Sequence, residues 1–174
     1  MRRSNGFTLM EVLIAAALLG FVAITAAAIN LSASHFFRIS TTQTKSQDEA
    51  AIVMERILRD IRSGYGAEVS VSPNSLQIYT VPYNTSSQSW SNFILYEFDT
   101  YTNPPTVKFY PYGGTAQIVS TKITNLNFLE VPDPTDPNRI NIKVQLTAQE
   151  PGAEAVSLES TATLLYRPTQ YPWE

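Results

Sequence analysis

The chain of 174 residues contains no cysteine and only one histidine, His35. Without cysteine it can form no disulfide, no thiolate metal site and no thiol nucleophile. The serines of the C-terminal part have no histidine in the same segment that would activate one of them as a nucleophile. Glycine-rich phosphate loops and basic clusters with interleaved aromatic residues are also missing. These absences argue against an enzyme.

Charge is sparse as well. Charged residues make up 16% of the chain and the net charge is −3, so nucleic acid is not an expected partner unless the protein serves DNA uptake. Hydrophobic residues make up 44%. The length suits one globular domain, provided that a membrane segment does not use up all the apolar residues.

The longest charge-free stretch lies near the N-terminus, over residues 12–29. Extended to residues 7–31, it would form a helix of about 37 Å, enough to cross a hydrocarbon core of about 30 Å. Arg2 and Arg3 precede it and the next basic residue is Arg38. This asymmetry predicts a cytoplasmic N-terminus and an extracytoplasmic C-terminal part.

Two simpler interpretations of this stretch compete. A cleaved secretory signal peptide has an apolar region of about 7–15 residues, which is shorter, although alanines at 26–28 keep this alternative open. A plain signal anchor does not explain the acidic residue Glu11, which lies inside the apolar stretch. An acidic residue in a membrane helix costs about 2.5–3.5 kcal/mol near the centre and usually has a function.

The residues around Glu11 form a specific pattern: a basic leader, Gly6, and then Phe7-Thr8-Leu9-Met10-Glu11 before the apolar run. The pattern resembles the cleavage and methylation signature of type IV prepilins and type II secretion pseudopilins, and it covers roughly the first thirty residues. The resemblance implies that a prepilin peptidase cuts between Gly6 and Phe7 and that the new amino group of Phe7 is methylated.

The same resemblance gives Glu11 a role in assembly. Its carboxylate would pair with the Phe7 amino group of a neighbouring subunit and so set the register between subunits. A second interpretation, compatible with the first, is that Glu11 satisfies the N-terminus of its own helix. Gly20 matches the glycine of the family's apolar segment. Ala28 stands where the main type IV pilins usually carry proline, which favours a minor pilin or pseudopilin.

The helix should continue beyond the membrane. In residues 45–62 apolar side chains recur every three or four positions, which predicts one buried stripe; its members are Ala50, Val53, Met54, Ile57, Leu58 and Ile61. Gly64 is a candidate C-cap, so one helix is expected over 7–63. His35, Phe36 and Phe37 are expected at the membrane surface.

From residue 67 onward β-branched and aromatic residues indicate strands. They are expected at 76–81, 92–98, 106–110, 126–131, 140–146 and 156–166, with a hairpin at 149–152 joining the last two. Short polar connections favour antiparallel pairing. The predicted fold is therefore α+β and pilin-like, with one long N-terminal helix packed on an antiparallel sheet. The expected organisation is a leader at 1–6, a transmembrane helix at 7–31, an amphipathic continuation at 32–63 and an extracytoplasmic sheet domain at 64–174.

Three further groups of residues are candidate sites. Asp133, Asp136 and Asn138 offer calcium ligands, but three prolines between 132 and 137 favour a rigid turn. Glu97 and Asp99 form a carboxylate pair without other support for a catalytic role. Trp90 would either contact a partner subunit or fold back on the sheet.

The resulting hypothesis is a structural and initiating minor subunit of a type II secretion pseudopilus or type IV pilus. No catalytic residue, metal or cofactor is expected. The implied partners are the prepilin peptidase, other pilins or pseudopilins and the bacterial inner membrane. A narrower resemblance is to the J-type minor pseudopilins. The alternatives are a minor pilin for adhesion or DNA uptake, a membrane-anchored carbohydrate-binding module and a membrane-anchored hydrolase. The absence of a plausible catalytic triad argues against the hydrolase.

Overall fold

The computed structural model describes residues 8–70, 74–82, 84, 91–136, 139–151 and 153–164. The chain divides into two compact units, one up to Thr41 and one from Thr42 onward. A single helix, α1, runs over Leu9–Ser63 and contributes to both units. The predicted helix over 7–63 is therefore confirmed, except that Phe7 lies outside the described residues.

The first unit consists of the N-terminal part of α1. Its large apolar side chains are exposed on all sides, with Leu9 at 82% and Ile24 at 70% of full exposure. Such a surface is stable only in lipid or against other apolar helices. This helix is long and apolar enough to cross a membrane.

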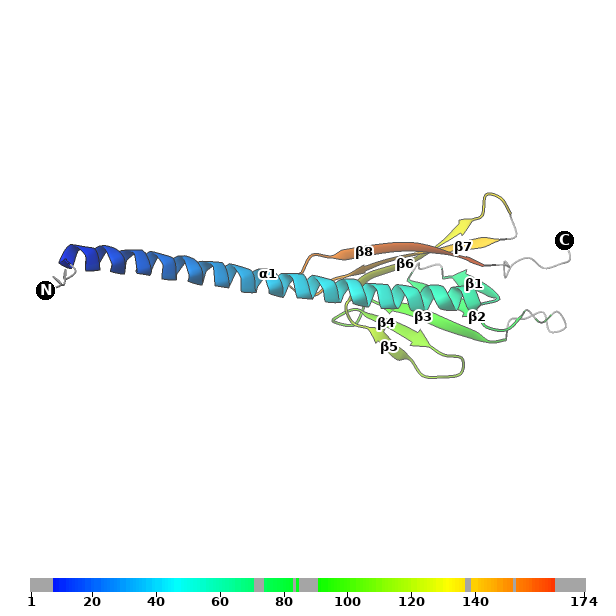
Figure 1. Ribbon diagram of the computed structural model, residues 1–174. Helices are drawn as coiled ribbons and strands as arrows, with labels where there is room; N and C mark the ends of the chain where they lie inside the picture. The colour runs from blue at the N-terminus through cyan, green and yellow to red at the C-terminus, as the bar shows by residue number, and fades with distance from the viewer. Residues whose placement is uncertain are drawn as a thin grey trace. The chain divides into compact units, whose positions relative to one another are not determined.

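The second unit contains the rest of α1 and two antiparallel sheets (Figure 1). The first sheet has five strands in sequence order, β1 Gly66–Val69, β2 Ser75–Tyr79, β3 Phe93–Asp99, β4 Thr106–Tyr110 and β5 Gln117–Ser120. The second has three, β6 Ile123–Pro132, β7 Ile140–Ala148 and β8 Val156–Leu164. Each strand pairs with its sequence neighbour within its sheet, as the short connections predicted.

The sequence predicted one sheet, and the described residues form two. Strands β7 and β8 pair antiparallel, as the predicted hairpin between them requires, although Gly152 of that hairpin lies outside the described residues. The strand predicted at 126–131 is present and longer than expected, since β6 has ten residues. Its first residues, Ile123 to Asn125, contain a register shift that breaks the alternation on which the prediction relied. Strands β1 and β5 were not predicted, and each has four residues.

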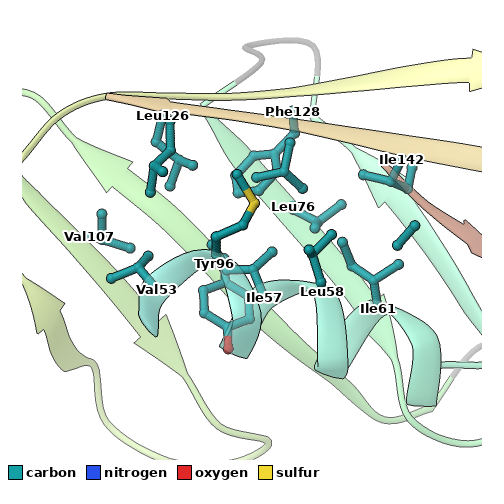
Figure 2. Close-up of a cluster of buried hydrophobic side chains, with 14 of the residues drawn as sticks. Val53, Ile57, Leu58, Ile61, Leu76, Tyr96, Val107, Leu126, Phe128 and Ile142 are labelled. Carbon is teal, nitrogen blue, oxygen red and sulfur yellow. The ribbon is translucent and has the colours of Figure 1, made fainter. Parts of the chain in front are cut away.

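One hydrophobic core joins α1 to both sheets. The predicted stripe is confirmed, because all six of its members are buried, together with Ser46. Figure 2 shows Ile57 and Leu58 of α1 among side chains from both sheets, with Leu76 and Tyr96 from the five-stranded sheet and Phe128 from the three-stranded one. The alternation predicted over 140–146 is also confirmed, since every second residue of β7 is buried.

Gly64 ends the helix where the sequence placed it. Its amide donates to the carbonyl of Ile61 at 3.1 Å. A Cβ on Gly64 would lie 2.5 Å from Cγ2 of Ile78, a side chain with no exposure. Because a buried isoleucine has little room to move, the close approach of chain and sheet requires glycine here.

Candidate functional site

The first turn of α1 is closed by hydrogen bonds between Thr8 and Glu11. The Thr8 amide donates to Glu11 Oε2 at 2.9 Å, and the Thr8 hydroxyl donates to the same oxygen at 3.0 Å. The Glu11 amide donates to Thr8 Oγ1 at 3.3 Å. The Thr8 carbonyl accepts from Val12 at 3.3 Å and thereby begins the helical ladder. This reciprocal arrangement is a capping box, with Thr8 at the N-cap and Glu11 at the third helical position.

The capping box explains how an acidic residue is accommodated at the start of an apolar helix. Its carboxylate satisfies a backbone amide that has no partner within the helix. It also lies where the helix dipole favours negative charge. The local role of Glu11 is thus visible in the structure. The contribution of Thr8 was not predicted from the sequence, although the spacing Thr-x-x-Glu is the recognised signal for this motif.

Glu11 remains accessible from outside its own chain. Thr8 and Glu11 are both exposed. The two hydrogen bonds that Thr8 donates, one from its amide and one from its hydroxyl, both end on Oε2, and no donor among the described residues is bonded to Oε1. A carboxylate offers about four lone-pair sites, so a cationic group can approach while the cap stays closed. Gly6 and Phe7, the predicted cleavage and methylation residues, lie outside the described residues.

The aromatic pair expected at the membrane surface is exposed on α1. Phe36 and Phe37 are 72% and 69% exposed, and His35 is exposed beside them. With Ala28 and Ser32, the two phenylalanines line a shallow notch along the helix. Their position at the membrane surface stays a prediction, because the other large apolar residues of this segment are exposed to a similar degree.

Glu97 and Asp99 of β3, the candidate carboxylate pair, each bind a side chain of β4. Tyr110 donates its hydroxyl to Glu97 Oε2 at 2.7 Å. Lys108 Nζ lies 2.5 Å from Asp99 Oδ2, and the Tyr101 amide donates to Asp99 Oδ1 at 2.9 Å. The hydrogen bond from Lys108 is the main cause that lowers the pKa of Asp99. Both acids therefore act as cross-strand links.

The Asp99–Lys108 pair predicts a pH dependence of stability. Because the pKa of Asp99 is lowered by Lys108, its contribution is present above the unfolded carboxyl value of about 3.9 and is lost as pH falls through the folded value. The Asp99 hydrogen bond raises the pKa of Lys108, so the lysine's contribution persists until pH rises above about 10.4. In urea titrations above pH 4, the free energy of unfolding of the parent should exceed that of Asp99→Asn. This difference should disappear as pH falls below 4. A difference in the free energy of unfolding that does not change with pH would contradict the pairing of Asp99 with Lys108.

The acids between β6 and β7 have partners of their own. Asp133 Oδ1 accepts from the Thr135 amide at 2.8 Å and from its hydroxyl at 2.6 Å. Asp136 Oδ2 lies 3.4 Å from Arg139 Nε. Over the described part of the chain, no group of three or more His, Cys, Asp or Glu side chains is placed to hold a metal ion. Asn138 and Trp90 lie outside the described residues.

Comparison with known proteins bears on the N-terminal segment. Residues 1–27 match the family described as prokaryotic N-terminal methylation motif. No curated protein and no solved structure matches the chain. The motif implies processing by prepilin peptidase and assembly into a pilus-type filament. The fold agrees with it, since a long N-terminal helix packed on antiparallel sheets is the pilin-like α+β arrangement. The chain is therefore a type IV pilin- or pseudopilin-like subunit that carries the prepilin-type methylation motif.

Proposed function

We propose that the protein is a structural and initiating minor subunit of a type II secretion pseudopilus or a type IV pilus. In this proposal the peptidase cuts between Gly6 and Phe7, and the new amino group of Phe7 is methylated. The observation that carries it is Glu11, the fifth residue after the proposed junction, which lies at the start of an apolar helix whose sides are exposed.

The carboxylate of Glu11 is expected to bind a cationic group of a neighbouring subunit. Once residues 1–6 are removed, each subunit begins with a positive amino group at Phe7. In lipid a carboxylate is costly unless it is paired, and the amino group of an adjacent subunit supplies the charge. Because both hydrogen bonds from Thr8 end on Oε2, Oε1 of the exposed Glu11 accepts this partner while the Thr8 cap stays closed. The pair sets the axial register between subunits.

The two parts of α1 then have separate tasks. Residues 7–31 span the inner membrane, with the N-terminus in the cytoplasm, and later pack in the filament core. Residues 32–63 carry the helix outward, and residues 64–174 form the extracytoplasmic domain. We further propose that the subunit is not an enzyme and acts through contacts with other pilins or pseudopilins. Ala28 favours a minor subunit, since the helix keeps good helix-forming residues through this region.

Mass spectrometry of the mature N-terminus tests the proposal. The full chain is expressed in a bacterial host with an active prepilin peptidase and, as a control, in the same host lacking it. The expected mature chain begins at N-methylated Phe7 in the first host and at Met1 in the second. A chain that begins at Met1 in both hosts, or after residue 28, would contradict the proposal.

A further inference from the structure

The first residue of α1, Leu9, lies close to the proposed junction between Gly6 and Phe7. Only Thr8, the N-cap, stands between Phe7 and the helix. A helix that began one turn earlier would include the bond that the peptidase is proposed to cut. The position of the helix start therefore decides whether this bond lies in helical or in non-helical backbone.

Two residues before the junction could cap such an earlier helix. Ser4 and Asn5 are both preferred N-cap types, and asparagine ranks among the strongest. The residues three positions after them are Phe7 and Thr8, so neither start has the Glu or Gln that completes a capping box. Thr8 has Glu11 at this spacing and forms the complete box. The sequence thus contains competing helix starts, and the box favours the one that excludes the junction.

The Thr8 amide distinguishes the two helix starts. In the structure it donates to Glu11 Oε2 at 2.9 Å. In a helix capped by Asn5, the amide of residue 8 would belong to the third helical residue and would donate to the Asn5 side chain instead. The amide has a single hydrogen, so the capping box with Glu11 and the cap by Asn5 compete for it.

An earlier start would protect the bond from hydrolysis. The carbonyl of Gly6 would then accept the amide of Met10, four residues later, in the helical pattern. In hydrolysis water adds to the carbonyl carbon of Gly6, the bond to the nitrogen of Phe7 breaks, and this nitrogen takes up a proton. Backbone that is bonded within a helix must first open locally, so the rate of cutting follows the population in which the bond is free.

We propose that Thr8 is a positioning residue for processing. Its capping box starts α1 after the junction and so keeps the bond between Gly6 and Phe7 in non-helical backbone, where the peptidase can cut it. This inference rests on the proposed function, because it names a residue that controls the proposed cleavage. The role is distinct from the pairing of Glu11 with a neighbouring subunit, since the cap acts in the precursor, before the amino group of Phe7 exists.

Thr8→Ala should slow the cleavage. The substitution removes the cap and places the residue of highest helix propensity at position 8, so the helix extends toward Asn5. The usual contribution of an N-cap side chain corresponds to about a fivefold change in population. In a pulse-chase of the full chain in a host with prepilin peptidase, the initial rate of processing should fall about fivefold, while processing still reaches completion.

Two variants are matched controls. Thr8→Ser keeps a hydroxyl that closes the capping box and should be processed at the rate of the parent. Thr25→Ala removes another threonine of α1, whose hydroxyl donates to the carbonyls of Phe21 and Val22, and it should also be processed at the parental rate. A parental rate for Thr8→Ala, or a rate for Thr8→Ser as low as that of Thr8→Ala, would overturn the proposal.

A second measurement separates the helix start from a direct contact between Thr8 and the peptidase. Full-length, unprocessed chains labelled with ¹³C are purified in detergent from a host that lacks the peptidase. The ¹³Cα and carbonyl chemical shifts of Gly6 and Phe7 should be non-helical in the parent and in Thr8→Ser, and should move toward helical values in Thr8→Ala. Slower processing of Thr8→Ala with unchanged shifts would overturn the proposal, since Thr8 would then act through its own contact with the peptidase.

The same pulse-chase distinguishes this inference from the proposed function. If the parent is not cut between Gly6 and Phe7 in the host with peptidase, the proposed function is contradicted. If the parent is cut there and Thr8→Ala is cut equally fast, only the positioning role of Thr8 is wrong.

Discussion

Replacing Glu11 by alanine should leave peptidase processing intact and abolish incorporation into the filament. The substitution leaves the Phe7 amino group of the neighbouring subunit without its counter-charge in an apolar surrounding. Breaking a buried ion pair in this way costs about 3–5 kcal/mol, which corresponds to a loss of more than about a hundredfold in the affinity of each contact. The measurements are the mass of the mature chain and its fraction in sheared filaments.

Two further variants separate the charge of Glu11 from its capping role. Glu11→Gln keeps a side chain that can close a capping box with Thr8 but removes the charge. Thr8→Ala removes the cap and keeps the charge, at a cost of about 1 kcal/mol in helix stability. We expect Glu11→Gln to assemble as poorly as Glu11→Ala, and Thr8→Ala to assemble nearly as well as the parent. The reverse order would mean that the cap, and not the ion pair, matters for assembly.

The parts of the fold that were predicted correctly are those in which one residue period runs through a long segment. The stripe from Ala50 to Ile61 has the helical period, and the residues from Ile140 to Leu146 alternate strictly. Both patterns arise because one face of a regular element is buried in the core. The helix boundary at Gly64 was predicted from the preference of glycine for helix ends. The structure adds a second reason for glycine there, which the sequence does not show, since a Cβ would lie 2.5 Å from Cγ2 of Ile78.

The division into two sheets could not be predicted, because it depends on contacts between segments distant in the sequence. Strand periodicity assigns residues to strands but does not say which strands share a sheet. Strands β1 and β5 are too short for a period to be recognised. The cross-strand links of Glu97 and Asp99 depend on the same register, because Tyr110 and Lys108 reach them only when β3 and β4 pair. The capping role of Thr8, by contrast, is local, and its spacing is present in the sequence.

Tyr96 joins α1 to the five-stranded sheet, and its replacement should destabilise the fold. Its side chain has no exposure and its ring lies 5.1 Å from that of Phe109. Its hydroxyl donates to Asp60 Oδ2 at 2.5 Å, across 36 residues of sequence. Burial, followed by the bond to Asp60, raises the pKa of Tyr96, so the hydroxyl remains a donor throughout the usual pH range. Arg56 lies over the Phe109 ring at 4.6 Å and completes the cluster.

Tyr96→Ala should therefore lower the free energy of unfolding by about 3–5 kcal/mol, the usual cost of removing a large buried aromatic ring. Tyr96→Phe keeps the ring and removes only the hydrogen bond to a carboxylate, so about 1.5–3 kcal/mol is expected. Urea unfolding of the full chain in detergent, followed by tryptophan fluorescence, measures both values.

Tyr110→Phe is the matched control, because its hydroxyl also donates to a carboxylate, that of Glu97, but on the outer face of the sheet. Water can replace that donor at the partly exposed Glu97, so a loss below about 1 kcal/mol is expected. The side chain of Tyr96 has no exposure, whereas that of Tyr110 is partly exposed, so water has less access to the hydroxyl that bonds to Asp60. Equal losses for the two phenylalanine variants would show that the bond between Tyr96 and Asp60 adds no more to the attachment of α1 than a surface hydrogen bond does.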